Sequence, residues 1–172
     1  MWKRRFFIFV MSMSTALTLQ AQENKRSEAE RLVREVVNKL ADTLGSDRAQ
    51  VRSSLFADDA LIINAFGDKR EGRKEIDKFW EEIFSSQMFR TSQNKEKEIS
   101  VRFLTPELAL VDRFYVLTGQ RGPNSGRELP PREIHMTLIL RKEKKHWLII
   151  YYSVADLRSL PAQNATPQKQ QR

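Results

Sequence analysis

The chain has 172 residues, a formal net charge of +8 and no cysteine. A chain without cysteine forms no disulfides and no cysteine-ligated metal sites, so its stability must come from packing. The densest basic cluster, residues 141–145, falls where a hairpin turn is expected, and no basic stretch is interleaved with aromatic residues. These features exclude a disulfide framework and argue against a nucleic-acid-binding protein.

The N-terminus has the order of a secretory signal. A basic segment, residues 3–5, precedes an apolar run over residues 6–19, and Ala21 offers a small residue for cleavage. An uncleaved membrane anchor is the alternative, but the run is shorter than the ~20 apolar residues of a membrane-spanning helix. We therefore expect cleavage after Ala21, no stable membrane anchor, and a bacterial periplasmic or secreted mature chain with a charge of +8 − 3 = +5.

The segments after the signal predict two helices. Ser27 and Glu30 fit a capping box, an apolar stripe at helical spacing follows, and Gly45 should end the first helix. A short second helix should follow. Asp47 should cap its N-terminus, and Val51 and Leu55 should face inward.

Residues 56–84 predict a strand, a turn and a helix. The strand is expected over residues 60–66, the turn at Gly67, and the helix after Gly72. A helix of this kind must fold back over the sheet so that both apolar faces are buried. Its apolar stripe is formed by Ile76, Phe79, Trp80, Ile83 and Phe84.

The second half of the chain predicts antiparallel strands. The strand over residues 108–118 is apolar on both faces apart from Asp112 and Arg113, so we expect both faces to be covered. Helices followed by strands of this kind indicate an α+β domain over residues 22–158, and residues 159–172 bury so little that a disordered tail is expected. The other strands are expected at 99–103, 133–140 and 147–154, with a turn at 105–107 and a loop at 119–131.

Several motifs occur in a fixed order: Phe-Ala-Asp-Asp-Ala at residues 56–60, an apolar strand, Gly67, Gly-Arg-x-x-Ile at residues 72–76, and Trp-Leu-Ile at residues 147–149. Together they resemble the SnoaL-like branch of the nuclear transport factor 2-like superfamily, which includes the ketosteroid isomerases. The resemblance covers about residues 33–153. It implies a curved antiparallel sheet wrapped around the N-terminal helices to form a conical pocket, and a homodimer that pairs through the outer face of the sheet.

The resemblance to ketosteroid isomerases is closest over residues 56–80, but the catalytic positions differ. The general base of these enzymes corresponds to Asn64, and an amide cannot take up a proton near neutral pH. Their tyrosine on the first helix has no counterpart, and their protonated aspartic acid falls near His135 or Met136. In addition, the Arg-x-Thr common in SnoaL-like proteins reads His135-Met136-Thr137. We therefore expect no ketosteroid isomerase chemistry.

The residues that we expect at the pocket are Asn64, Trp80, Arg113, Tyr115, His135 and Tyr152. Asp112 and Arg113 lie on opposite faces of one strand, so one of them should point inward. His135 could act as an acid or a base. The favoured interpretation is that it lies on the face opposite the pocket with its hydrogen bonds satisfied. Asp58 and Asp59 could form a carboxylate pair, but we favour residues of a helix end and a turn. We expect no cofactor and no metal, because the two histidines are far apart.

Three functions fit this pattern. The favoured one is a secreted, non-catalytic module that binds a small apolar molecule in the pocket. The alternative is a proton-transfer or hydration enzyme, such as an isomerase, cyclase or dehydratase, in which His135, Asp112 or Tyr152 replaces the missing groups. A third is a dimeric scaffold with a vestigial pocket. An open cavity lined by Asn64 and two converging titratable groups would favour the enzyme.

Overall fold

A computed structural model describes residues 3–43, 48–89, 91–122 and 124–157 of the chain. The predicted helix end at Gly45, the predicted cap at Asp47 and the predicted tail lie outside these residues. The elements, in chain order, are α1 (Lys3–Asp42), α2 (Ala49–Ser53), β1 (Phe56–Ile63), β2 (Lys69–Glu71), α3 (Arg73–Ser85), the 3₁₀ turn η2 (Gln87–Phe89), β3 (Gln93–Thr105), β4 (Leu108–Thr118), β5 (Arg132–Glu143) and β6 (His146–Asp156).

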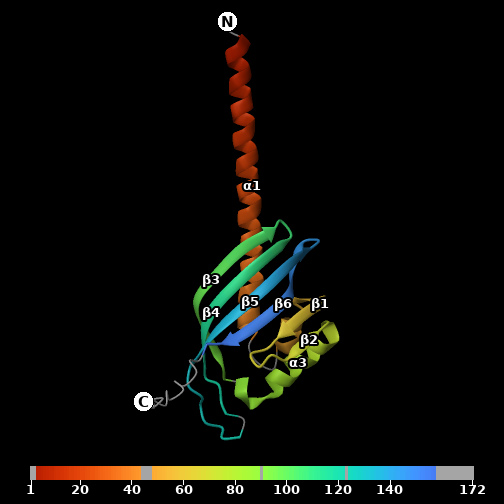
Figure 1. Ribbon diagram of the computed structural model, residues 1–172, viewed down its shortest axis with the longest axis vertical. Helices are drawn as coiled ribbons and strands as arrows, with labels where there is room; N and C mark the ends of the chain where they lie inside the picture. The colour runs from red at the N-terminus through yellow and green to blue at the C-terminus, as the bar shows by residue number, and fades with distance from the viewer. Residues whose placement is uncertain (1–2, 44–47, 90, 123, 158–172) are drawn as a thin grey trace, which may run out of the picture.

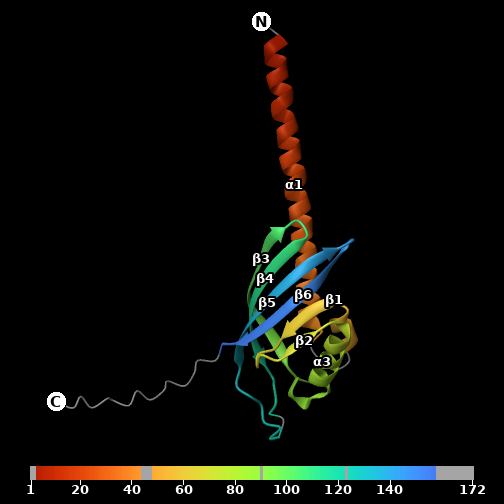
Figure 2. The same cartoon turned by 45° about the vertical axis from the view of Figure 1, so that its right-hand side comes forward.

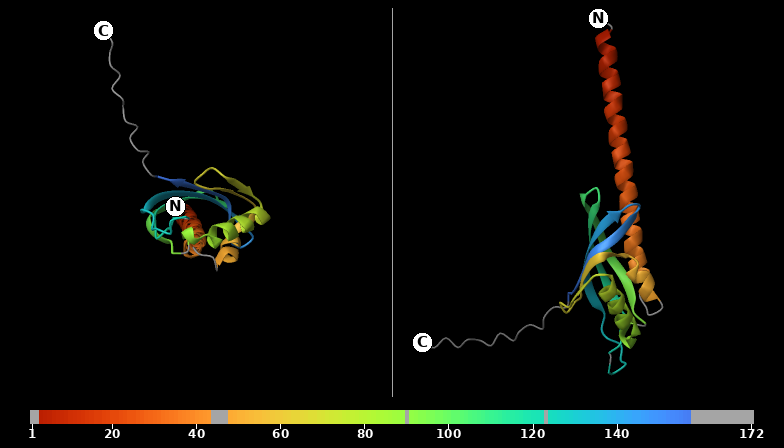
Figure 3. Two further views of the ribbon diagram at one scale, coloured as in Figure 1. Left: turned by 90° about the horizontal axis from the view of Figure 1, so that it is seen from below. Right: turned by 90° about the vertical axis from the view of Figure 1, so that its right-hand side faces the viewer.

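The strands form one six-stranded sheet in the order β2-β1-β6-β5-β4-β3. All neighbours are antiparallel except β1 and β6, which run parallel. The sheet is curved and open, and α1 and α3 lie on its concave side (Figures 1 and 3). This arrangement confirms the predicted α+β class and the curved sheet around the N-terminal helices.

Alternation along the strands places the core on the concave face. In β4 the buried positions are Ala109, Val111, Arg113, Tyr115 and Leu117, while the residues between them are partly exposed. The helices α1 and α3 each carry an apolar stripe along one side, because apolar residues recur with the helical period. These stripes pack on the concave face of the sheet and cover it. The buried residues that they contribute are Val33, Val37 and Leu40 from α1 and Ile76, Phe79, Trp80 and Phe84 from α3.

The first helix differs from the prediction. It runs without interruption through Ser27, so the capping box at Ser27 and Glu30 does not start a helix. Residues 3–42 contain neither glycine nor proline, and Arg31 forms ion pairs with Glu28 and Glu35 along the helix surface. Both features favour helix continuation over a break.

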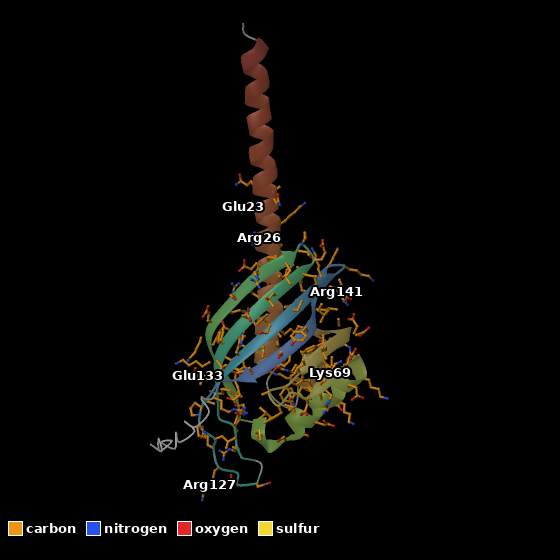
Figure 4. All side chains as sticks on the ribbon, in the orientation of Figure 1. Glu23, Arg26, Lys69, Arg127, Glu133 and Arg141 are labelled. Atoms are coloured by element: carbon orange, nitrogen blue, oxygen red, sulfur yellow. The ribbon has the colours of Figure 1, made fainter. Side chains whose placement is uncertain are left out.

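The N-terminal part of α1 extends beyond the sheet, whereas its C-terminal part packs against it (Figures 1 and 2). Arg26 lies near the point where the helix reaches the sheet, with its guanidinium carbon 6.0 Å from the ring centroid of Phe103 in β3 (Figure 4). Within the residues that the structure describes, no helix is both long enough and apolar enough to cross a membrane.

The first strand also differs from the prediction, since β1 begins at Phe56 and ends at Ile63 rather than spanning residues 60–66. Asp58 and Asp59 are therefore strand residues and not residues of a helix end and a turn. Each carboxylate is held by an arginine, Asp58 by Arg73 and Asp59 by Arg141. Arg73 also donates to the backbone carbonyls of Ser53 and Phe56, and so ties the start of α3 to α2 and β1.

The short helix α2 has a different register from the predicted one. Val51, predicted to face inward, is 41% exposed, whereas Arg52 is 3% exposed. Leu55 is buried as predicted. The predicted turn glycines are in place: Gly67 and Gly72 have φ of 87° and 82°, a conformation that glycine adopts without steric cost.

Candidate functional site

A cavity of about 410 Å³ lies between α3 and the concave face of the sheet. Its wall comes from α3, η2, the β1–β2 turn, the sheet, α2 and the segment after β4. Most of the lining is apolar or aromatic. The lining residues that matter for the site are Arg52, Asn64, Asp68, Phe79, Trp80, Ile83, Phe89, Asn94, Tyr115, Gln120, Arg132, Tyr152 and Val154.

Trp80 is the centre of an aromatic cluster beside the cavity. Its ring centroid lies 4.7 Å from that of Phe79, 5.8 Å from that of Phe84 and 5.7 Å from that of Tyr152. Phe79, Trp80 and Phe84 belong to the stripe that the helical period places on one side of α3, and Tyr152 alternates into the concave face of β6. The contacts join the helix to the sheet across one wall of the cavity.

Arg52 packs against this cluster and also lines the cavity, and the sequence did not predict it. Its guanidinium carbon is 4.1 Å from the ring centroid of Trp80, a cation–π geometry, and Nη1 donates to the carbonyl oxygen of Leu40 near the end of α1. Burial lowers the pKa of Arg52, because desolvation disfavours the charged form. One sequence signal indicates that Arg52 faces inward: it lies three residues from buried Ala49 and three from buried Leu55. The signal is weak because α2 has only five residues.

Tyr115 and Tyr152 add two buried phenols to the cavity wall. Burial raises the pKa of both hydroxyls, and the positive charge of Arg52 opposes each rise. Arg113 points inward and is 2% exposed, but it does not line the cavity. Its guanidinium carbon lies 4.6 Å from the ring centroid of Tyr115, and its Nε donates to Glu96 over 2.9 Å.

The cavity lining includes a second polar group that the sequence did not predict. Arg132 Nε donates to Asp156 Oδ2 over 2.7 Å, and Arg132 Nη1 donates to Gln120 Oε1 over 3.1 Å. Gln120 is 1% exposed although it belongs to a connecting segment. No spacing pattern predicts such a residue, because its burial depends on the tertiary path of the segment after β4.

Asn64 lies on the cavity wall, but its side chain is engaged in the turn after β1. Its Oδ1 accepts hydrogen bonds from the backbone N–H groups of Phe66 and Asp68, both over 2.9 Å. Its Nδ2 donates to the Asp68 carboxylate over 2.9 Å. The amide therefore closes the β1–β2 turn, and its oxygen accepts two hydrogen bonds there.

His135 lies on the convex face of the sheet, away from the cavity. Its Nε2 is 3.0 Å from Asp112 Oδ1, which also accepts a hydrogen bond from the Thr137 hydroxyl over 3.1 Å. The imidazole stacks on Phe114 with ring centroids 4.3 Å apart. The structure thus brings Asn64, Trp80, Tyr115 and Tyr152 to one cavity and places Arg113 and His135 elsewhere.

No group of three or more histidine, aspartate or glutamate residues in the described part of the chain has an arrangement suited to a metal ion. The cavity's carboxylates, Asp68 and Glu82, come from the β1–β2 turn and from an exposed position on α3. None of the described residues that line the cavity is a histidine.

Comparisons with known proteins agree with this architecture. A family model described as SnoaL-like domain matches residues 33–156. A protein from Novosphingobium aromaticivorans described as NTF2-like with a cystatin-like fold has a TM-score of 0.69 at 18% identity, covering 85% of this chain and 93% of that one. A putative scytalone dehydratase from the same species has a TM-score of 0.65 at 15% identity, with 79% and 89% covered.

A third similar structure is a hexachlorocyclohexane dehydrochlorinase from Novosphingobium barchaimii, with a TM-score of 0.70 at 7% identity, covering 83% of this chain and 95% of that one. At such identities the likeness to solved structures establishes the fold alone. A search of curated proteins finds no match.

Proposed function

The chain belongs to the SnoaL-like domain family, and on this premise we propose that it is a secreted module that binds a small, largely apolar molecule without ketosteroid isomerase chemistry. The observation that carries the proposal is the cavity of about 410 Å³ with its mainly apolar lining. Its size lies within the roughly 300–1,000 Å³ of small-molecule sites, and aromatic walls with a few polar groups are their usual composition.

The absence of isomerase chemistry follows from the groups at the relevant positions. Asn64 replaces the base, and its amide is held by the β1–β2 turn. The sequence of α1 contains no tyrosine that could donate to an enolate oxygen. Met136 points to the concave face, where an acid would be needed, and His135 points away from it.

The alternative is a proton-transfer or hydration enzyme, which the names of the dehydratase and dehydrochlorinase structures suggest. Of the substitute groups considered, His135 and Asp112 lie on the convex face, and only Tyr152 lines the cavity. Because burial raises its pKa, Tyr152 keeps its proton near neutral pH. It can therefore donate a hydrogen bond, but it is a poor general base, and the geometry favours binding over catalysis.

Export and dimer formation are parts of the same proposal. The order of basic, apolar and small residues at the N-terminus supports export and cleavage after Ala21. Partly exposed apolar residues on the convex face, including Leu110, Phe114 and Ile139, support a homodimer through that face.

A neutral fluorescent probe tests the binding function. N-phenyl-1-naphthylamine should bind the full chain with an increase in fluorescence, and Ile83→Arg should abolish binding because a charged side chain would enter the apolar lining. Val51→Arg is the matched control, since Val51 is 41% exposed and does not line the cavity. Equal binding by wild type and Ile83→Arg, or no binding by wild type, would refute the proposal.

A further inference from the structure

Arg52 is a buried cation without a carboxylate partner in the described part of the chain. It is 3% exposed, and the groups near it are the Leu40 carbonyl, the Trp80 and Phe84 rings, and two tyrosines. Its Nε has no hydrogen-bond partner among the described residues. A buried charge without a counter-ion is costly, and proteins keep one mainly where something else compensates it.

Two further donors that belong to residues lining the cavity lack acceptors in the described structure, namely Trp80 Nε1 and Gln120 Nε2. The orientation of the Gln120 amide follows from its neighbour: Arg132 can only donate, so the Gln120 oxygen must face it and the NH₂ group must face away. One acceptor on the wall, Asn94 Oδ1, is also unpaired. Donors without partners therefore outnumber acceptors at this site.

None of the other charged residues that line the cavity forms an ion pair with Arg52 in the described structure. Arg132 is paired with Asp156, and Asp68 accepts a hydrogen bond from Asn64. The remaining lining charges, Arg70 and Glu82, are of opposite sign. An anionic group placed in the cavity beside Arg52 would therefore lie next to a positive charge that forms no ion pair in the described structure.

On these grounds, and resting on the binding function proposed above, we infer that the ligand is an amphipathic carboxylic acid whose carboxylate binds at Arg52 and whose apolar body lies along Phe79, Ile83 and Phe89. A carboxylate supplies the negative charge and the acceptors that the wall lacks. Arginine forms charge-assisted hydrogen bonds with this planar group, and these are stronger than those between neutral groups.

Paired probes of equal shape test the inference. We would measure the Kd of 2-naphthoate and of neutral 2-naphthamide by isothermal titration calorimetry with the full chain. Wild type should bind the carboxylate at least about tenfold more tightly, because hydrogen bonds to charged groups contribute more than neutral ones. Arg52→Met should remove this preference and retain binding of the amide. Arg102→Met is the control, because it removes the same charge from an exposed position on β3 and should leave the preference unchanged.

A measurement on the wild type keeps the test independent of how well the Arg52 variant folds. In a ¹⁵N NMR spectrum, the indole N–H resonance assigned to Trp80 by Trp80→Phe should shift more with 2-naphthoate than with 2-naphthamide. Equal affinity for the two probes would overturn the inference and leave the binding function intact. Failure of both probes to bind would overturn the inference together with the binding function.

Discussion

Replacing Trp80 with alanine should destabilise the domain by about 3–5 kcal/mol, the usual cost of deleting a large buried aromatic side chain. Trp80 is 4% exposed and contacts the rings of Phe79, Phe84 and Tyr152. An aromatic side chain of this kind buries about 150–250 Å², which at about 25 cal/mol per Å² corresponds to about 4–6 kcal/mol as an upper limit. The substitution also removes the ring beneath the Arg52 guanidinium. Even if neighbouring side chains fill the cavity left by Trp80, Arg52 loses its cation–π contact with that ring.

Urea unfolding followed by far-ultraviolet circular dichroism measures this loss without relying on tryptophan fluorescence. Phe66→Ala is the matched control, because Phe66 is an aromatic residue that is 82% exposed, and its removal should change the free energy of unfolding by less than about 0.5 kcal/mol. If Trp80→Ala lowered the free energy of unfolding by less than about 1 kcal/mol, the register of α3 and the burial of Trp80 would be refuted.

Four further outcomes are expected. An absorbance assay for conjugation of an unconjugated enone should show no turnover by wild type and at most weak turnover by Asn64→Asp; robust wild-type turnover would contradict the proposal. Arg141 holds the pKa of Asp59 below its ordinary value of 3.8, so the pair stabilises the folded state fully above pH 3.8 and loses this effect as the pH falls further. Asp59→Asn should therefore reduce the drop in Tm below pH 3.8, by a small amount because the pair is exposed. Light scattering should give a dimer mass, and Phe114→Glu a monomer mass, whereas a monomeric wild type would count against the convex-face interface. Intact mass of the protein from its native envelope should correspond to a chain that starts at Gln22, and a mass that includes Met1 would contradict cleavage.

The sequence predicted the parts of the fold that depend on regular periods. Ile76, Phe79, Trp80 and Phe84 are buried as the helical spacing of α3 predicted. The alternation of β4 likewise placed one of Asp112 and Arg113 inward, and the structure shows that it is Arg113. Over long elements, many residues report the same period, so local exceptions do not shift the register.

The site was harder to predict, because its polar residues depend on short or irregular segments. Arg52 contradicts the binary pattern of apolar-inside and polar-outside residues, and the five-residue α2 is too short for a period to correct the error. The predicted strand over residues 60–66 includes Asn64, whereas β1 ends at Ile63 and the amide closes the following turn. The strand starts at Phe56 because the buried residues Phe56 and Ala57 precede two aspartates that arginines hold at the surface.

The parallel pairing of β1 with β6 leads us to expect that the cavity assembles late during folding. It joins residues distant in sequence, with Phe56 opposite Ile149, whereas the hairpins β3–β4 and β5–β6 join near neighbours. Contacts between distant residues form more slowly than local ones. Because Arg52 precedes β1 and Tyr152 belongs to β6, these two cavity residues meet only after this late step. A ligand should therefore slow unfolding and leave the rate of folding almost unchanged.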